Sequence, residues 1–452
     1  MKRKNKDLTE GSIPKLLAQL TWPMIFGMLG MVIFNLVDTY FVGKLGTDQL
    51  AALSFSFPVV MMVGSITMGM GIGTSALISR MIVSKDRSVV QDYSGDAINL
   101  SLLTTLIFVI AGQLTLEPLF NALGASEEMM SYIKEYMVTW YWGMIFLVVP
   151  MVGNNIIRAT GDTFTPGMIM VFATVTNIIL DPLLIFGYGP FPEMGLKGAA
   201  LATVISRAAG MVLSLYILIV RDKLLTIYIP KMKAMLQTWG KVMYVAGPAA
   251  AGLLIIPLSL GIITRMVAGY GEEAVAAFGV VSRIEMFAMM IINALASVMT
   301  IFSGQNWGKE KVGRIRESLR VTSLFSLAWG VLIYIVSRFW AEDMAGIFSP
   351  NAEVVRITTR YLIIVSLSYG FQGILMVGVA IFNGVNQPLK STALTFLRMM
   401  GLYIPLALIL SKQLELLGIF WAAFIANVLV GFVTYIWLRG SLRKSMQVIT
   451  VK

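Results

Sequence analysis

Two acidic residues lie inside long apolar stretches of this sequence, and they are the residues with the clearest capacity for chemistry. Asp38 lies in the run 20–42 and Asp181 in the run 166–187. Each run is long enough to cross a bilayer as a helix, and a carboxylate in mid-span costs roughly 2.5–3.5 kcal/mol on insertion scales. Because such a residue normally faces a cavity or a partner, the two acids predict a buried site for a cation or a proton.

Two further polar residues belong to the same candidate site. Asn177 precedes Asp181 by four residues, so both side chains lie on one helix face. Thr203 lies in the next apolar run, at a depth in the outer half of the bilayer similar to that of the two acids. Their oxygens are hard ligands that suit Na+, and two neighbouring acids in a low dielectric also suit proton binding. Both mechanisms need the same residues, so the sequence leaves Na+ and H+ open.

The composition predicts a polytopic membrane protein. The chain has 452 residues, of which 57% are hydrophobic and 13% charged, with a mean hydropathy of +0.80. It contains no His and no Cys, so any proton transfer falls to Asp or Glu. There is no phosphate-binding loop, metal-ligand cluster or nucleophile with a base, so we expect a transporter driven by an ion gradient and not an enzyme. No cofactor is expected beyond the coupling ion.

Twelve apolar runs predict an all-α protein with twelve transmembrane helices. They cover residues 20–42, 51–79, 97–116, 134–156, 166–187, 197–220, 245–268, 276–303, 321–340, 358–383, 392–411 and 417–438. The first run is too long for a signal peptide and lacks a cleavage site. Lys and Arg concentrate in alternate connections, which places both termini in the cytoplasm by the positive-inside rule. The net charge of +11 is thereby explained by the membrane, without nucleic acid as a partner.

An internal repeat divides the chain into two six-helix bundles. Trp22-Pro23 aligns with Gly247-Pro248, and Pro182 aligns with Pro405. We therefore predict an N-terminal bundle over 1–220, a cytoplasmic connector over 221–244 and a C-terminal bundle over 245–452. An even number of spans in each half makes the repeats parallel, related by a pseudo-two-fold axis along the membrane normal.

The repeat shows that the candidate site is confined to the first half. Its polar residues align with apolar ones in the second half: Asp38 with Ile263, Asn177 with Met400, Asp181 with Ile404 and Thr203 with Ala426. A cluster that only supported the fold would be expected in both halves. The asymmetry favours a functional site over a structural one.

Four segments together resemble the multidrug and toxic compound extrusion (MATE) family of transporters. They are Pro23 with Asn35-Leu-Val-Asp38-Thr-Tyr-Phe-Val-Gly43, Arg158-Ala-Thr-Gly-Asp162, Asn177 with Asp181-Pro182, and Gly198-Ala-Ala-Leu-Ala-Thr203. The likeness covers essentially the whole chain, and it is greatest to the DinF-like prokaryotic branch, whose cation site is in the N-terminal bundle. The resemblance implies a V-shaped pair of bundles around a central cavity that opens alternately to each side of the membrane.

The resemblance also implies antiport, in which an amphiphilic, often cationic drug or metabolite leaves as Na+ or H+ enters. It implies a monomer in a prokaryotic cytoplasmic membrane. Asp38, Asn177, Asp181 and Thr203 match the family's coupling residues, and Pro23 matches its bending first helix. Tyr136 matches a family position that lines the N-bundle cavity. Phe34 departs from the family pattern, because some relatives have Tyr there, and this removes a hydroxyl near Asp38.

Other residues are weaker candidates for the substrate cavity. They are the charges Arg283 and Glu285 and the flexible side chains Met61, Met62, Met286 and Met289. The alternatives are a structural ion pair involving Arg398 for the charges and core packing for the methionines. For the whole protein, the alternatives are a lipid-linked-sugar flippase of the same wider superfamily and a non-transporting membrane scaffold or channel.

Overall fold

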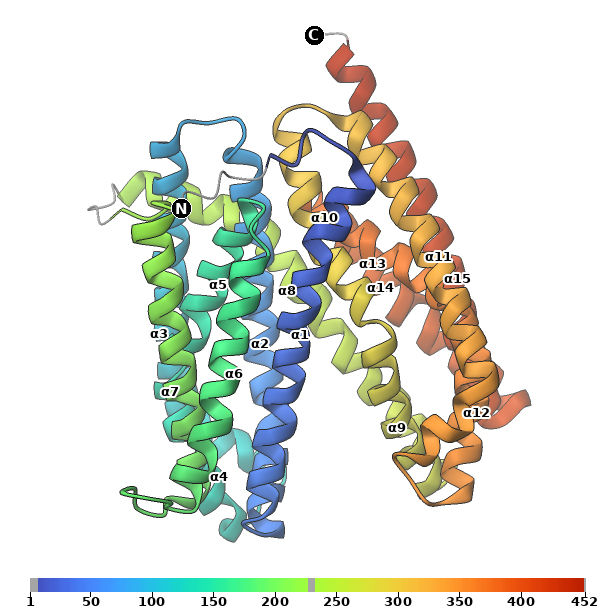
Figure 1. Cartoon of the computed structure of the whole chain (residues 1–452). Helices are drawn as coiled ribbons and strands as arrows, with labels where there is room; N and C mark the ends of the chain where they lie inside the picture. The colour runs from blue at the N-terminus through green and yellow to red at the C-terminus, as the bar shows by residue number, and fades with distance from the viewer. Residues whose placement is uncertain (1–6, 227–231, 451–452) are drawn as a thin grey trace. The chain divides into compact units, whose positions relative to one another are not determined.

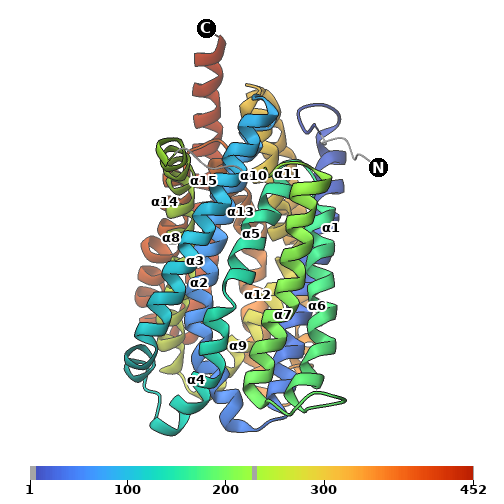
Figure 2. The same cartoon turned by 90° about the vertical axis from the view of Figure 1, so that its left-hand side faces the viewer.

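The computed structural model describes residues 7–226 and 232–450, and every regular element in those ranges is a helix (Figures 1 and 2). The basic residues 2–6 and part of the predicted connector lie outside the described residues. The first half contains α1 (Ile13–Gly43), α2 (Thr47–Met81), α3 (Arg87–Ala122), α4 (Glu127–Trp142), α5 (Ile145–Ala159), α6 (Phe164–Ile185), α7 (Gly195–Tyr216) and the π-helix η1 (Ile217–Arg221).

The second half is likewise built of helices in its described part. It contains α8 (Met232–Ala268), α9 (Glu272–Ala288), α10 (Met290–Gly308), α11 (Val312–Gly346), α12 (Ala352–Val365), the 3-10 helix η2 (Ser366–Ser368), α13 (Tyr369–Gly384), α14 (Pro388–Phe396), the π-helix η3 (Leu397–Tyr403) and α15 (Ile404–Thr450).

These helices account for the twelve predicted spans. Among the described residues, nine helical stretches are long and apolar enough to cross a membrane, and two bent pairs bring the number to 11. The longest stretch, Pro388–Gln447, has 60 residues and is interrupted at Glu415, whose φ of 52° is not helical. It therefore supplies two spans, and the prediction of an all-α fold with twelve spans in two bundles is confirmed.

Two predicted spans are bent where the sequence predicted straight helices. The run 134–156 is divided between α4 and α5, which meet at 44°, and the run 276–303 is divided between α9 and α10, which meet at 51°. The second bend occurs at Met289, four residues after Glu285. Hydropathy reports only how apolar a stretch is, so it does not detect a bend whose backbone groups are satisfied locally.

Two of the points at which the chain passes between its two compact units lie inside helices. One unit contains Trp22–Gly247, and the other contains Leu8–Thr21 together with the chain from Pro248 onward. Both boundaries inside helices fall next to repeat-related prolines, Pro23 in α1 and Pro248 in α8. A proline inside a helix removes one backbone hydrogen bond, so each of the two shared helices is weakened next to a unit boundary.

Hydrogen bonds hold the start of the described chain in the second unit. The backbone N–H of Leu8 donates to Gln305 Oε1 at 3.1 Å, and Asn306 Nδ2 donates to the Leu8 carbonyl at 3.2 Å. Arg314 Nη1 donates to the Gly11 carbonyl at 3.0 Å. Because α10 and α11 supply these partners, the segment that leads into α1 is anchored to the second unit.

Glycines bring α1 close to α6 inside the first unit. A Cβ atom on Gly27 would lie 3.1 Å from the Gly167 Cα, and one on Gly167 would lie 2.9 Å from the Pro23 carbonyl oxygen. One turn further on, Thr174 Oγ1 donates to the Gly30 carbonyl at 3.1 Å. Small residues allow this approach in a membrane, where packing and hydrogen bonds replace the hydrophobic effect between helices. The contact aligns the helices that carry Asp38 and Asp181.

Gly167→Ala should destabilise the protein by about 1–3 kcal/mol, because the added methyl group forces α6 away from the α1 backbone. Gly64→Ala is the matched control, since a Cβ atom there meets nothing within 4 Å. Thermal unfolding of the detergent-purified variants measures both effects. Equal melting temperatures for the two variants would contradict the close approach of α1 and α6.

Candidate functional site

The four residues predicted for the cation site are all buried in the first unit. Asp38 on α1 is 8% exposed, Asn177 and Asp181 on α6 are fully buried, and Thr203 on α7 is 3% exposed. Asn177 Nδ2 donates to Asp181 Oδ1 at 3.0 Å, as their four-residue spacing predicts. The Asp38 carboxylate is close enough for its charge to act on Asp181. The structure therefore brings Asp38, Asn177 and Asp181 together, and Thr203 lies on α7, which packs against α6. We call these four residues the N-unit cluster.

Each residue of the N-unit cluster retains a buried oxygen without a hydrogen-bond partner among the described residues. The four atoms are Asp38 Oδ1, Asn177 Oδ1, Asp181 Oδ2 and Thr203 Oγ1. Buried polar atoms in native proteins are almost always hydrogen-bonded, and a buried unsatisfied one costs about 1–3 kcal/mol. Four such oxygens, two of them from carboxylates, form a donor set that fits a hard cation such as Na+. A proton on one carboxyl group would also convert an acceptor into a donor.

Arg207 is a neighbour of this cluster that the sequence analysis did not include. Its guanidinium carbon lies 5.6 Å from the centre of the Phe34 ring, and its charge acts on Asp38 and Tyr136. Arg207 follows Thr203 by four residues, so it shares a face of α7 with that residue. This four-residue spacing is the feature of the sequence that could have placed Arg207 beside the cluster. The arginine partly balances the two acids, which makes the charge of the cluster sensitive to a bound ion.

The predicted aromatic residues lie beside the cluster. Tyr136 on α4 is 5% exposed, and its side chain is within electrostatic range of both Asp38 and Asp181. Phe34 on α1 is 9% exposed and lies against Arg207 through a cation–π contact. A tyrosine and an arginine are thus polar neighbours of the two acids, and the role of Tyr136 in lining a cavity stays a prediction.

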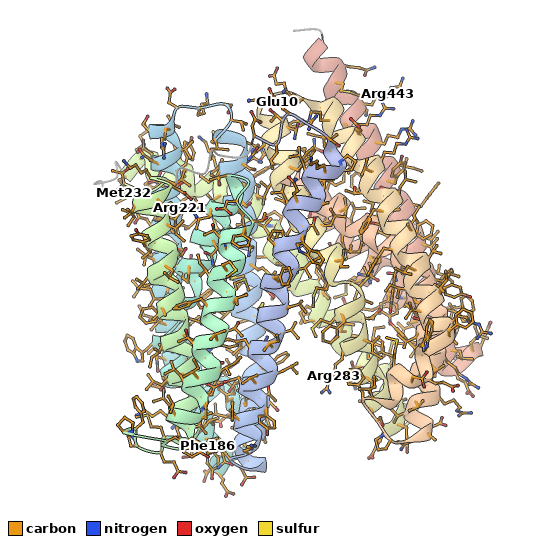
Figure 3. The ribbon with its side chains drawn as sticks, viewed as in Figure 1. Glu10, Phe186, Arg221, Met232, Arg283 and Arg443 are labelled. Carbon is orange, nitrogen blue, oxygen red and sulfur yellow. The ribbon has the colours of Figure 1, made fainter. Side chains whose placement is uncertain are left out.

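The other predicted cavity residues are distributed over several environments. Met61 and Met62 on α2 are about half exposed, as is Met286 on α9, whereas Met289 is buried in the core of the second unit. Arg283 is exposed and makes no ion pair within the described part of the chain (Figure 3). Their contact with substrate stays a prediction.

Glu285, by contrast, belongs to a second polar cluster. Tyr361 donates from its hydroxyl to Glu285 Oε1 at 3.5 Å, and the charge of Arg398 acts on the same carboxylate. Arg398 Nε donates to Asn427 Oδ1 at 2.8 Å, and Asn427 Nδ2 donates to Ser368 Oγ at 2.9 Å. We call this group the C-unit cluster. Glu285 and Arg398 are only half buried, so a polar ligand can reach them.

Irregular helices supply most of the C-unit cluster. Ser368 ends the 3-10 helix η2, Arg398 belongs to the π-helix η3, and Glu285 lies in the last turn before the break at Met289. The buried hydroxyl of Tyr403 adds a polar atom without a partner among the described residues, and the side chain of Tyr369 lies close to Glu285. Because π-helical segments and breaks occur often at functional sites, the cluster is a candidate for substrate contact. In the sequence, this cluster is indicated by the ionisable residues Glu285 and Arg398 inside apolar spans.

A polar cluster inside a two-bundle helical membrane protein defines a small-molecule transporter. The family model for MatE matches residues 23–183 and 248–409, and each match begins at one of the repeat-related prolines. The chain belongs to the MATE family. The two matches also bear out the internal repeat, and the first contains Asp38, Asn177 and Asp181.

Curated relatives are transporters of similar length. The chain is 36% identical to the FAD transporter of Shewanella oneidensis over 428 residues, which is 95% of each chain. It is 26% identical to the probable multidrug resistance protein YoeA of Bacillus subtilis over 440 residues, covering 94% of each chain.

Solved structures agree with this assignment. The Vibrio cholerae MATE transporter VcmN in the bent form is 29% identical, has a TM-score of 0.91 and is matched over 96% of this chain and 98% of its own. A MATE structure in the straight conformation is 25% identical, has a TM-score of 0.90 and is matched over 98% and 99%. The fold is therefore that of MATE transporters, in line with the predicted class.

Thr203→Val should abolish stabilisation by Na+ without lowering the melting temperature in its absence, because it replaces an unsatisfied buried hydroxyl with a methyl group of similar size. Ser214→Ala is the control, since Ser214 is a buried hydroxyl on the same helix that also has no partner among the described residues. Melting temperatures with Na+ and with choline test the prediction. An unchanged Na+ shift in Thr203→Val would remove this hydroxyl from the ligand set.

Proposed function

We propose that this protein is a cation-coupled antiporter that exports amphiphilic small molecules through a prokaryotic cytoplasmic membrane. The single observation that carries the proposal is the set of four unsatisfied buried oxygens on Asp38, Asn177, Asp181 and Thr203. The sequence contains no nucleotide-binding motif, which agrees with transport driven by an ion gradient. Na+ and H+ are both compatible with this donor set.

Binding of the ion changes the electrostatics between two helices. Without it, the carboxylates of Asp38 on α1 and Asp181 on α6 repel each other in a medium of low dielectric. A bound cation, or a proton on one carboxyl group, removes that repulsion and allows the helices to approach. A ligand shifts a conformational equilibrium only by its different affinity for the two states. The repulsion between these acids supplies such a difference.

Helix α1 connects this event to the second unit. Residues up to Thr21 are anchored in that unit, while Asp38 lies about four helical turns beyond Pro23 in the first unit. Pro23 provides the bend, because its missing N–H and its ring weaken the helix at that point. Movement of α1 against α6 at the acids is thereby passed to the start of the helix.

Two substrate classes have support. Amphiphilic drugs are supported as substrates by relatives named as multidrug resistance and multidrug export proteins. A flavin dinucleotide is supported as a substrate by the relative that is 36% identical and is named an FAD transporter. The C-unit cluster favours the second class, since the Glu285 carboxylate, the Arg398 guanidinium and the Asn427 amide can pair with a ligand that carries both donors and acceptors. The flippase and scaffold alternatives gain no support from these relatives.

Asp38→Asn should reduce gradient-driven efflux to the background of empty liposomes, because the amide has the size of the carboxylate without its charge. Efflux of a fluorescent cationic dye and of FAD from proteoliposomes, under a Na+ gradient or a pH gradient, measures this and identifies the ion and the substrate class. Ile404→Val is the control, as Ile404 is the apolar counterpart of Asp181 in the second half. Equal efflux by wild type and Asp38→Asn would refute coupling at this site.

Pro23→Ala should preserve ion binding while reducing efflux several-fold, because it restores a backbone N–H and straightens α1. Ion binding is followed by the Na+-dependent or pH-dependent melting temperature, and efflux is measured on the same preparation. Pro118→Ala on α3 is a control for removing a helical proline elsewhere. If both activities survive in Pro23→Ala, the proline is a static kink and the hinge lies at another position.

A further inference from the structure

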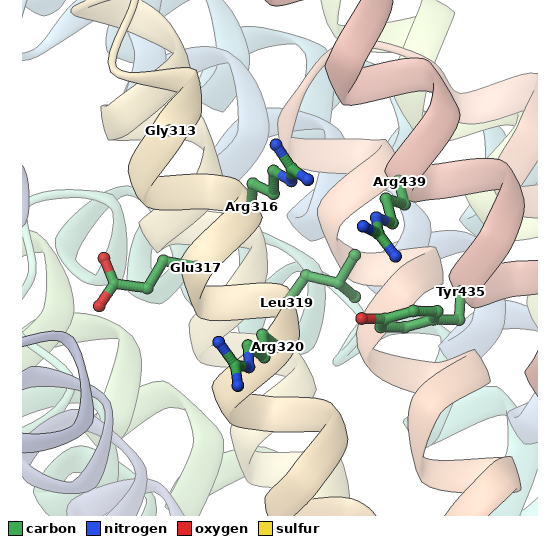
Figure 4. Close-up of a pocket in the computed structure, with 7 residues that line it drawn as sticks. All are labelled: Gly313, Arg316, Glu317, Leu319, Arg320, Tyr435 and Arg439. Atoms are coloured by element: carbon green, nitrogen blue, oxygen red, sulfur yellow. The ribbon is translucent and has the colours of Figure 1, made fainter.

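Arginines from two helices line a hollow in the second unit that neither polar cluster uses. A cavity of about 460 Å³ is lined by Arg316 and Arg320 of α11 and by Tyr435 and Arg439 of α15. An adjoining cavity of about 560 Å³ shares Arg316, Tyr435 and Arg439 and extends to Arg443. We call the two together the arginine hollow (Figure 4).

The arginines are arranged on facing sides of the two helices. Arg316 and Arg320 are four residues apart, as are Arg439 and Arg443, so each pair occupies one helix face. In Figure 4 the guanidinium groups of Arg316 and Arg439 point toward each other across the space between α11 and α15. Arg316 and Arg439 thus border both cavities, while Arg320 borders the first and Arg443 the second; all four side chains are exposed.

No acidic side chain within the described ranges neutralises these arginines by an ion pair. Glu317 borders the first cavity, but its carboxylate extends on the other side of α11 from Arg316 and Arg439 (Figure 4). Neighbouring like charges repel each other, and an anion between them removes the repulsion. Guanidinium groups hold phosphate oxygens through two parallel N–H donors, which makes arginine suited to such an anion.

The surface next to the hollow is apolar. Phe432 and Ile436 of α15 are 59% and 53% exposed, and Leu324 of α11 is 59% exposed. Leu324 follows Arg320 by one helical turn, and Ile436 precedes Arg439 by one turn. The arginines lie near the ends of α11 and α15 that the positive-inside rule places at the cytoplasm. A ligand at this position meets cations at headgroup depth and exposed apolar side chains toward the bilayer centre.

We propose that the arginine hollow binds the phosphate headgroup of an anionic phospholipid from the cytoplasmic leaflet. The acyl chains lie along Phe432, Ile436 and Leu324, while the guanidinium groups of Arg316 and Arg439 hold the phosphate from opposite sides. Basic pockets between membrane helices are known to take anionic headgroups. Bound lipid joins α11 to α15 and so stabilises the second unit, independently of the coupling ion in the first.

The test uses the full-length transporter in nanodiscs of phosphatidylcholine, with and without phosphatidylglycerol. Arg316→Gln with Arg439→Gln is the test variant, and Lys85→Gln with Lys233→Gln is the control, because it removes the same charge from exposed positions outside the hollow. Phosphatidylglycerol should raise the melting temperature of wild type and control but not of the test variant. Native mass spectrometry should show that the test variant binds the lipid with roughly thirtyfold lower affinity, since each of the two arginines near the surface contributes roughly 1 kcal/mol.

Two further measurements distinguish a lipid headgroup from free phosphate, and paired arginine donors from charge alone. Inorganic phosphate in phosphatidylcholine nanodiscs should give no stabilisation, and a shift equal to that of the lipid would overturn the proposal in favour of free phosphate. Arg316→Lys with Arg439→Lys keeps the charge but loses the paired donors, so it should retain only part of the lipid shift. It also provides a folded variant if the glutamine pair fails to express. Retention of phosphatidylglycerol by the test variant at the level of the control would likewise overturn the proposal.

Discussion

The cost of placing a charge or an unsatisfied polar atom in an apolar span governs this structure. In hydrocarbon there is no water to satisfy such a group, so it must meet another group of the protein, a ligand or the membrane surface. The N-unit cluster holds four oxygens without a partner among the described residues, whereas in the C-unit cluster Arg398 donates to Asn427. The arginine hollow lies near helix ends, where charge costs little. Position in the membrane and the available partners thus distinguish three kinds of site within one helical fold.

The same constraint explains where the helices become irregular. A spanning helix satisfies its own backbone, so a departure from α-helical geometry is tolerated only if local hydrogen bonds replace the lost ones. The π-helix η3 does this with wider backbone turns while it presents Arg398 and Tyr403 to the C-unit cluster. The break at Met289 and the 3-10 helix η2 place Glu285 and Ser368 in the same cluster. Irregular backbone and polar side chains therefore occur together, because each supplies hydrogen-bond partners that the other needs inside the membrane.

Sharing of helices between units has a mechanical consequence. α1 begins in the second unit, where Arg314 and Asn306 hold the segment just before it. It continues into the first unit, where Gly27 and Gly167 bring it against α6. A continuous helix transmits displacement better than a loop, because its backbone hydrogen bonds keep its length constant. The proline at the boundary allows a change of direction without a change of length. Under the proposed function, this combination links an ion site in one unit to the other unit.

The sequence by itself determined the membrane class, the twelve spans, the two halves and the restriction of Asp38, Asn177 and Asp181 to the first half. These follow from residue type and spacing along one helix, because transfer into hydrocarbon and the 3.6-residue repeat are local properties. Only the tertiary structure decided that Arg207 lies beside Phe34, that Glu285 groups with Arg398 and Asn427, and that α11 and α15 turn their arginines toward one space. Those groupings depend on which helix faces meet, and that is set by close contacts such as Gly27 with Gly167 between residues far apart in the chain.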